Sequence, residues 1–175
     1  VAGYSFLFDG EAATLPDGAI DLAHTVDPHQ VSSAPLSEGF RYFHLRTCDH
    51  ADNCSAGVHL GELRIDLSPP LPPTGVGSLS HVVGVPTADA TIDMAWTTAT
   101  DVGSPPSGLK GYSYTFNHSA TPTCNLELDL SAASTAVTGP TLAAGLWYFH
   151  LCAQDVAGNW GPAAIAGPYE IIDDA

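Results

Sequence analysis

Basic residues are scarce in this sequence. Its 175 residues include only 4 Lys and Arg against 19 Asp and Glu, which gives a formal net charge of -15 at pH 7. A surface this negative repels phosphate backbones and anionic lipids, so we expect no nucleic-acid partner. Divalent cations, high salt or simple solubility fit the acidic excess better.

Long hydrophobic runs are also missing. No segment reaches the roughly 18 uninterrupted apolar residues that a membrane-spanning helix needs, so we expect no membrane insertion. The apolar opening at residues 1–8 is shorter than a signal-peptide core and has no basic flank. The sequence does not begin with Met, and we expect it to be a piece of a longer polypeptide.

Motifs typical of enzymes are absent. The sequence has no GxSxG, HExxH, Walker loop, strand-linked GxGxxG or EF-hand loop. Carboxylates are plentiful, but no pattern brings two of them into one cleft, and solvated surface is their ordinary place. We therefore expect a protein that is not an enzyme and needs no cofactor, with calcium as the one candidate ion.

The sequence does contain an internal repeat. The segment FRYFHLRTCDHADNC at residues 40–54 resembles LWYFHLCAQDVAGNW at residues 146–160, and GYSFLF at residues 3–8 resembles GYSYTF at residues 111–116. The copies lie about 100 residues apart, which is the size of one domain. A chain of 175 residues has no room for two complete copies, so one copy must be incomplete.

Short segments of alternating polarity indicate β-strands. Residues 92–96, 112–117 and 147–152 alternate between large apolar side chains and small or polar ones, which is the period of a strand with one buried face. Gly, Pro, Asn and Asp cluster between these segments, and no stretch supports a helix of ordinary length. Many short strands of this kind predict an antiparallel β-sandwich.

Four motifs in order closely resemble fibronectin type III-like repeats of bacterial extracellular and surface proteins. They are TIDMAW at residues 91–96, DVGSPPSGLKGYSYTF at residues 101–116, GLWYFHLCAQDVAGNWG at residues 145–161 and GPYEIID at residues 167–173. The resemblance implies an all-β protein of tandem immunoglobulin-like or fibronectin type III sandwiches. For activity it implies little, because such sandwiches serve as spacers, adhesive modules and assembly units.

On this template residues 69–175 form a complete domain and residues 1–68 a partial one. The strands of the complete domain are expected near residues 77–83 (A), 91–97 (B), 111–117 (C), 123–130 (C′), 133–138 (E), 146–154 (F) and 163–172 (G). The partial unit is expected to keep strands C, C′, E, F and G and to lack strands A and B. Four prolines in the connection SPPLPPTG predict a short, semi-rigid joint.

The four cysteines are Cys48, Cys54, Cys124 and Cys152, without CxxC spacing. An even number in a chain rich in Pro, Gly, Ser and Thr favours disulfides and an extracellular or cell-surface location, while four free thiols in a cytosolic protein are the alternative. On the template Cys48 ends strand F and Cys54 begins strand G, so we expect them to bond across the turn. By elimination Cys124 then pairs with Cys152.

The turns between strands F and G carry the candidate metal ligands. Asp49 and Asp52 lie in DHADN, and Asp155 lies in the equivalent DVAGN. Asp and Asn in tight turns usually bond to nearby backbone amides, which is the role expected here. Weak calcium binding by the same carboxylate oxygens is the alternative.

Other polar and aromatic residues are candidates for binding roles. His44 and His150 are repeat equivalents on the side of strand F that faces solvent, and we expect surface residues rather than zinc ligands. Trp160, beside the second F–G turn, is a weak candidate platform for carbohydrate. Asn53 and Asn117 begin N-glycosylation sequons.

The missing strands decide the functional hypothesis. Without strands A and B, the inward side chains of Phe6, Phe8, Phe43 and Leu45 are expected to be poorly covered. We expect a non-enzymatic structural or adhesive segment of an extracellular protein. Its first unit would be completed by upstream domains of the same polypeptide or by neighbouring copies of itself. The alternatives are a subunit of a self-assembling extracellular filament, built by strand donation, and a carbohydrate-binding accessory module.

Overall fold

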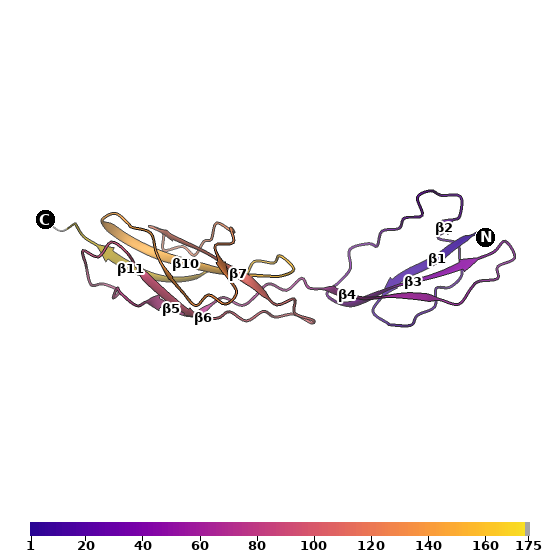
Figure 1. The fold of residues 1–175 in the computed structure, drawn as a ribbon, viewed down its shortest axis with the longest axis horizontal. Helices are drawn as coiled ribbons and strands as arrows, with labels where there is room; N and C mark the ends of the chain where they lie inside the picture. The colour runs from indigo at the N-terminus through magenta and orange to yellow at the C-terminus, as the bar shows by residue number, and fades with distance from the viewer. Residues whose placement is uncertain (174–175) are drawn as a thin grey trace. The chain divides into compact units, whose positions relative to one another are not determined.

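The computed structural model describes residues 1–173 and divides the chain into two compact units, Val1–Leu67 and Ser68–Ala175. Its regular elements are all β-strands, as Figure 1 shows for each unit. Within the described residues no helix is long and apolar enough to cross a membrane. The all-β fold predicted from the sequence is confirmed.

The second unit is a sandwich of two antiparallel sheets. One sheet has the strand order β5-β6-β9 and the other the order β11-β10-β7-β8. Their bounds are β5 Thr74–Ser78, β6 Asp93–Thr97, β7 Leu109–Asn117, β8 Leu130–Ser131, β9 Ala136–Thr138, β10 Gly145–Asp155 and β11 Ala164–Ile171. These seven strands follow the order expected for strands A to G.

The core of the second unit lies between its two sheets. Every second residue of β6 and β10 points inward, as their alternating sequences predict. The indole of Trp96 on β6 lies 5.6 Å from the ring of Tyr112 and 6.2 Å from the ring of Phe149, centroid to centroid. Phe149 and its neighbour on the same face, Leu151, have no exposed surface.

Strands A and C′ of this unit differ most from the expected bounds. Strand A ends at Ser78, because the Ser78 hydroxyl accepts backbone N–H bonds from Ser80 and His81 and so begins a turn. Strand C′ is reduced to β8, because the segment before it does not lie at the sheet edge. Cys124 in that segment is bonded to Cys152 on β10, so the chain runs across the outer face of the sheet.

The first unit contains one antiparallel sheet, of order β2-β1-β3-β4. The bounds are β1 Gly3–Asp9, β2 Leu22–Ala23, β3 Gly39–Cys48 and β4 Val58–Ile65. The register repeats that of the second unit, since Phe8 pairs with Phe43 on β3 as Phe116 pairs with Phe149 on β10. In residues 1–67 there is no counterpart of the sheet β5-β6-β9.

The expectation of a strand E in the first unit is wrong. Residues 24–38 form no strand, although they occupy the place in sequence that β9 has in the second unit. The reason is that β9 pairs only with β6. Where no equivalent of β6 exists, the backbone of this segment has no ladder partner.

Candidate functional site

The inner face of the first sheet is the candidate site. Residues paired directly across antiparallel strands lie on the same face, and one face carries a continuous set of apolar side chains. They are Tyr4, Phe6 and Phe8 from β1, Phe43 and Leu45 from β3, and Val58 and Leu60 from β4. We call this set the open face.

The open face is less covered at β3 and β4 than the equivalent face of the second unit, whereas Phe6 and Phe8 on β1 are partly buried, as their equivalents on β7 are. Val58 and Leu60 are 65% and 63% exposed, and Phe43 and Leu45 are only partly buried. Phe149 and Leu151, the repeat equivalents of that last pair, have no exposed surface at all. The same face is therefore a core surface in one unit and an accessible one in the other.

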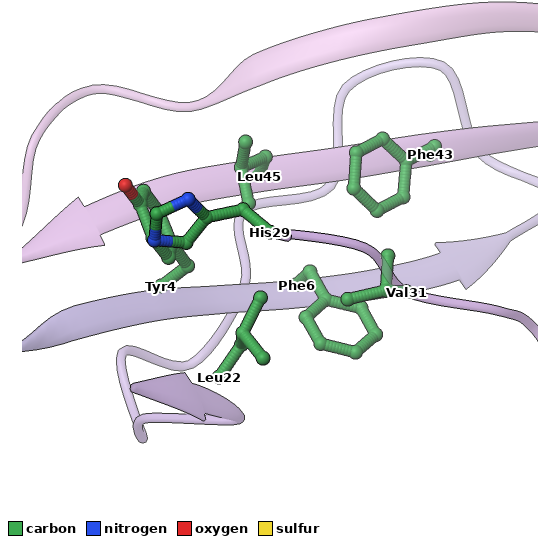
Figure 2. Close-up of a pocket in the computed structure, with 7 residues that line it drawn as sticks. All are labelled: Tyr4, Phe6, Leu22, His29, Val31, Phe43 and Leu45. Atoms are coloured by element: carbon green, nitrogen blue, oxygen red, sulfur yellow. The ribbon is translucent and has the colours of Figure 1, made fainter. Parts of the chain in front are cut away.

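A cavity of about 290 Å³ lies on the open face (Figure 2). It is lined by Tyr4, Phe6, Leu22, His29, Val31, Phe43 and Leu45. The imidazole of His29 meets the Tyr4 ring edge-on at 5.2 Å, so the segment 24–38, which forms no strand, provides one wall of the cavity. The other wall is the sheet itself, where the rings of Phe6 and Phe43 lie 6.1 Å apart.

His44 and His150 were expected at the surface, and this expectation is wrong. Both are wholly buried. Alternation along the strand placed them on the outer face correctly, but it does not report the loops that cover that face. The Nε2 atom of His44 lies 3.0 Å from a carboxylate oxygen of Asp9, and its Nδ1 lies 2.7 Å from Nδ1 of His59.

His150 has a matching environment in the second unit. The backbone N–H of Thr123 donates to its Nδ1 at 3.3 Å, so Nε2 carries the proton and donates to the side-chain oxygen of Asn117 at 2.9 Å. Burial lowers the pKa of His150 from its usual value. Both nitrogens are therefore occupied by protein partners, which leaves no lone pair for a metal ion.

The loops over the two outer faces share one hydrogen bond to their sheets. The backbone N–H of Phe6 donates to Asp21 at 2.8 Å, and that of Tyr114 donates to Asp129 at 2.8 Å. A second pair is built differently. Arg46 donates to the Pro16 carbonyl at 3.1 Å, at the position where Cys152 is bonded to Cys124 in the other unit.

The two disulfides join the pairs predicted from the sequence. Cys48 is bonded to Cys54 and Cys124 to Cys152, with Cα atoms 4.1 and 6.2 Å apart, and no cysteine is free. The first bond closes the F–G turn of the first unit. The second ties the loop that covers His150 to its sheet.

Two of the candidate calcium ligands, Asp49 and Asp155, accept hydrogen bonds from the backbone of the turns in which they lie. One carboxylate oxygen of Asp49 accepts the backbone N–H groups of Ala51 and Asn53, and the Asn53 side chain and these amides lower the Asp49 pKa. Asp155 likewise accepts two backbone N–H bonds within its own turn, from residues 158 and 159. Asp52 takes a positive φ of 61°. A calcium role for these residues stays a prediction.

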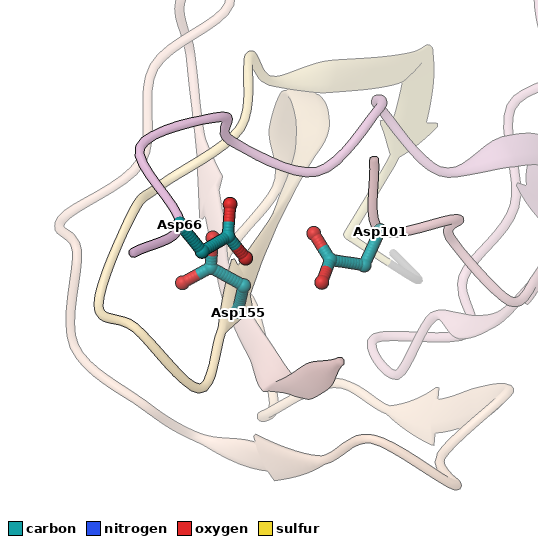
Figure 3. Close-up of side chains that lie close together, drawn as sticks. All are labelled: Asp66, Asp101 and Asp155. Carbon is teal, nitrogen blue, oxygen red and sulfur yellow. The ribbon is translucent and has the colours of Figure 1, made fainter. Parts of the chain in front are cut away.

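Asp101 was not singled out from the sequence. Its carboxylate lies with oxygens within 4.8 Å of those of Asp155 (Figure 3). One Asp101 oxygen accepts the backbone N–H of Gly108 at 2.6 Å, and the other is buried without a hydrogen bond. The two residues lie close together because Gly108, which donates to Asp101, accepts the backbone N–H of Val156, and Leu109 pairs with Asp155. No local sequence signal reports this proximity.

The remaining candidates lie as follows. Trp160 is partly buried, and its backbone pairs with that of Gln154 in an isolated bridge; a carbohydrate-binding role for it stays a prediction. Asn53 is exposed in its turn. The side-chain oxygen of Asn117 is engaged by His150 and by the backbone N–H of Ser119.

Comparisons with known proteins bear on the fold. No protein-family model matches the sequence, and no curated protein matches it. Solved structures do match, among them the crystal structure of the FN1–FN3 domains of chicken CNTN1 (contactin-1), with a TM-score of 0.50 and 12% sequence identity. The alignment covers 97% of this chain and 56% of that one.

The fold is fibronectin type III-like. At 12% identity the likeness shows the fold alone. It agrees with the two-sheet arrangement of the second unit and with the resemblance drawn from the sequence motifs.

Proposed function

We propose that this chain is a non-enzymatic structural or adhesive segment of an extracellular protein, of the kind found on bacterial surfaces. Its first unit is completed by strands from outside residues 1–175. The observation that carries the proposal is the open face. On the equivalent face of the second unit Phe149 and Leu151 have no exposed surface, whereas in the first unit Val58 and Leu60 are more than half exposed.

The free energy of burying the apolar side chains of the open face supports the proposal that outside strands cover it. Burying one large apolar side chain is worth about 1.5–3 kcal/mol. Two of the seven side chains on the open face are mostly exposed and five are partly buried, so covering the face adds a part of this amount for each. The sum is a sizeable share of the total stability of a domain, about 5–15 kcal/mol. Strands that pair with residues 24–38, which form no ladder of their own, would add hydrogen bonds to that gain.

The proposed location follows from the cysteines and the fold. All four cysteines form disulfides, which persist in oxidising environments outside the cytosol. Fibronectin type III-like sandwiches are common in extracellular adhesive and structural proteins. The net charge of -15 repels the phosphates of nucleic acid, so no nucleic-acid partner is proposed.

The strands have two candidate sources. The preferred one is the polypeptide upstream in the parent protein, because the equivalent strands of the second unit, β5 and β6, directly precede β7 in sequence. The second is a neighbouring copy, which would make the chain a filament subunit. The carbohydrate-binding alternative depends on Trp160 alone, a residue that is partly buried.

Hydrogen exchange and light scattering on residues 1–175 test the proposal. We expect a monomer at low concentration whose second unit is strongly protected and whose residues 3–67 exchange much faster. Growth of the scattering mass with concentration would favour the filament. A strict monomer with strongly protected amides throughout residues 3–67 would show that no outside strand is needed, and the proposal would be wrong.

A further inference from the structure

The cavity on the open face corresponds to a filled position in the second unit. The rings of Tyr112 and Phe149 are both in contact with the indole of Trp96, at 5.6 and 6.2 Å. The repeat equivalents of these two residues are Tyr4 and Phe43, and both line the cavity. The side chain missing from the first unit is thus the equivalent of Trp96.

We infer that this cavity is a receptor site for one aromatic side chain, of the size of an indole, carried on an incoming β-strand. The inference rests on the proposed function and adds the chemistry of what is bound. A cavity of about 150 Å³ with apolar walls is enough to bind benzene. A volume of about 290 Å³ therefore accommodates the larger indole ring.

The second unit also gives the register of the incoming strand. There β6 pairs with β9 so that Met94 faces Val137, and Trp96 follows two residues later on the same face. Val31 lies as many residues before Gly39 as Val137 lies before Gly145. A strand paired beside Val31 as β6 is beside β9 carries its aromatic residue over Tyr4 and Phe43.

The incoming segment is therefore a β-hairpin like β5–β6, in which the inner strand has the pattern apolar-x-apolar-x-aromatic. In β6 and the residue before it this pattern is Ile92, Met94 and Trp96, all buried. The spacing places all three side chains on one face of a strand. Met adapts to irregular gaps and the aromatic residue supplies most of the buried area.

The geometry favours such a hairpin over a second copy of the open face. His29 and Val31 form a wall over the cavity, so a flat apolar sheet reaches it only after displacing that segment. A strand that inserts one large side chain can lie beside the wall and extend the pairing. Two copies that each carry a net charge of -15 also repel one another.

The test uses a synthetic peptide of residues 74–97, which contains the β5 and β6 sequences, and the same peptide with Trp96→Ala. Each is titrated into isotope-labelled chain of residues 1–175, and NMR shifts report where it binds. We expect shifts at Tyr4, Val31 and Phe43 with the parent peptide, and affinity lower by about tenfold or more for the Ala peptide.

Two chain variants complete the test. Val31→Trp fills the cavity from its own wall and should abolish peptide binding. Leu15→Trp adds an indole at a position that is 58% exposed and outside the cavity, and should leave binding unchanged. The peptide pair gives a result with the parent chain even where a variant fails to fold.

Several results would overturn the inference. They are the absence of binding by the parent peptide, equal affinity of the two peptides, shifts confined to the second unit, and undiminished binding to Val31→Trp. A dimer that protects the cavity amides before any peptide is added would mean that a second copy covers the face. Equal affinity of the peptides with shifts on the open face would refute the aromatic site and leave the proposed function standing.

Discussion

Replacing Phe149 by Ala in the second unit and Phe43 by Ala in the first removes the same side chain from equivalent positions. Phe149 has no exposed surface and packs against Phe116 at 5.0 Å and Tyr114 at 5.9 Å. Phe to Ala in a filled core costs about 3–5 kcal/mol. Phe43 is only partly buried and contacts Phe8 at 4.8 Å, so we expect roughly 1–2 kcal/mol there.

The two units can be followed separately. All three tryptophans, at positions 96, 147 and 160, lie in the second unit, so indole fluorescence during urea unfolding reports that unit alone. With a urea slope of about 2 kcal/mol per molar, Phe149→Ala should lower the midpoint by about 1.5–2.5 M. Hydrogen exchange measured by mass spectrometry on peptides from residues 1–67 reports the cost of Phe43→Ala.

A matched control is available on the same strand as Phe149. Leu146 on β10 is 50% exposed, and Leu146→Ala should change stability by no more than about 0.5 kcal/mol. Equal costs for Phe43→Ala and Phe149→Ala would mean that the open face is already covered within residues 1–175. That result would refute the reasoning behind both proposals.

Three further outcomes are expected. Replacing Cys124 and Cys152 together by Ser should destabilise the second unit by about 3 kcal/mol, measured by urea unfolding, because the bond closes a long loop. Because burial lowers the pKa of His150 in the folded state, the second unit should lose stability as pH falls below about 6.5; His150→Gln should remove that slope in urea unfolding at several pH values. Calorimetric titration with millimolar calcium should give no heat, because Asp49 and Asp155 accept hydrogen bonds within their own turns; measurable heat would contradict this and support a calcium site.

Local sequence was sufficient for the strands that carry alternation. Residues 92–96 and 147–152 alternate because one face of each is buried, and all but Ile92, which directly precedes β6, lie in strands. The missing strand E is different, because a strand exists only where a neighbour supplies hydrogen bonds. Its residues can look the same whether or not that neighbour is present.

The residues of the candidate site also divide into those whose place local sequence predicts and those whose place depends on distant segments. Alternation assigned His44 and His150 to the outer face, but their burial depends on loops that return over the sheet from elsewhere in the sequence. The contact of Asp101 with Asp155 depends on the pairing of β7 with β10. The apolar character of the open face could be predicted, because it needed only the repeat and the count of strands.

The loop over the outer face is held by a disulfide in the second unit and by a hydrogen bond in the first, so a reducing agent would affect the two loops differently. Breaking the Cys124–Cys152 bond frees the loop that shields His150. The corresponding loop of the first unit is tied to Arg46 by a hydrogen bond to the Pro16 carbonyl, which thiols do not affect. Mild reduction is thus selective. It frees the loop over the outer face of the second unit, while the first unit loses only the Cys48–Cys54 bond across its F–G turn.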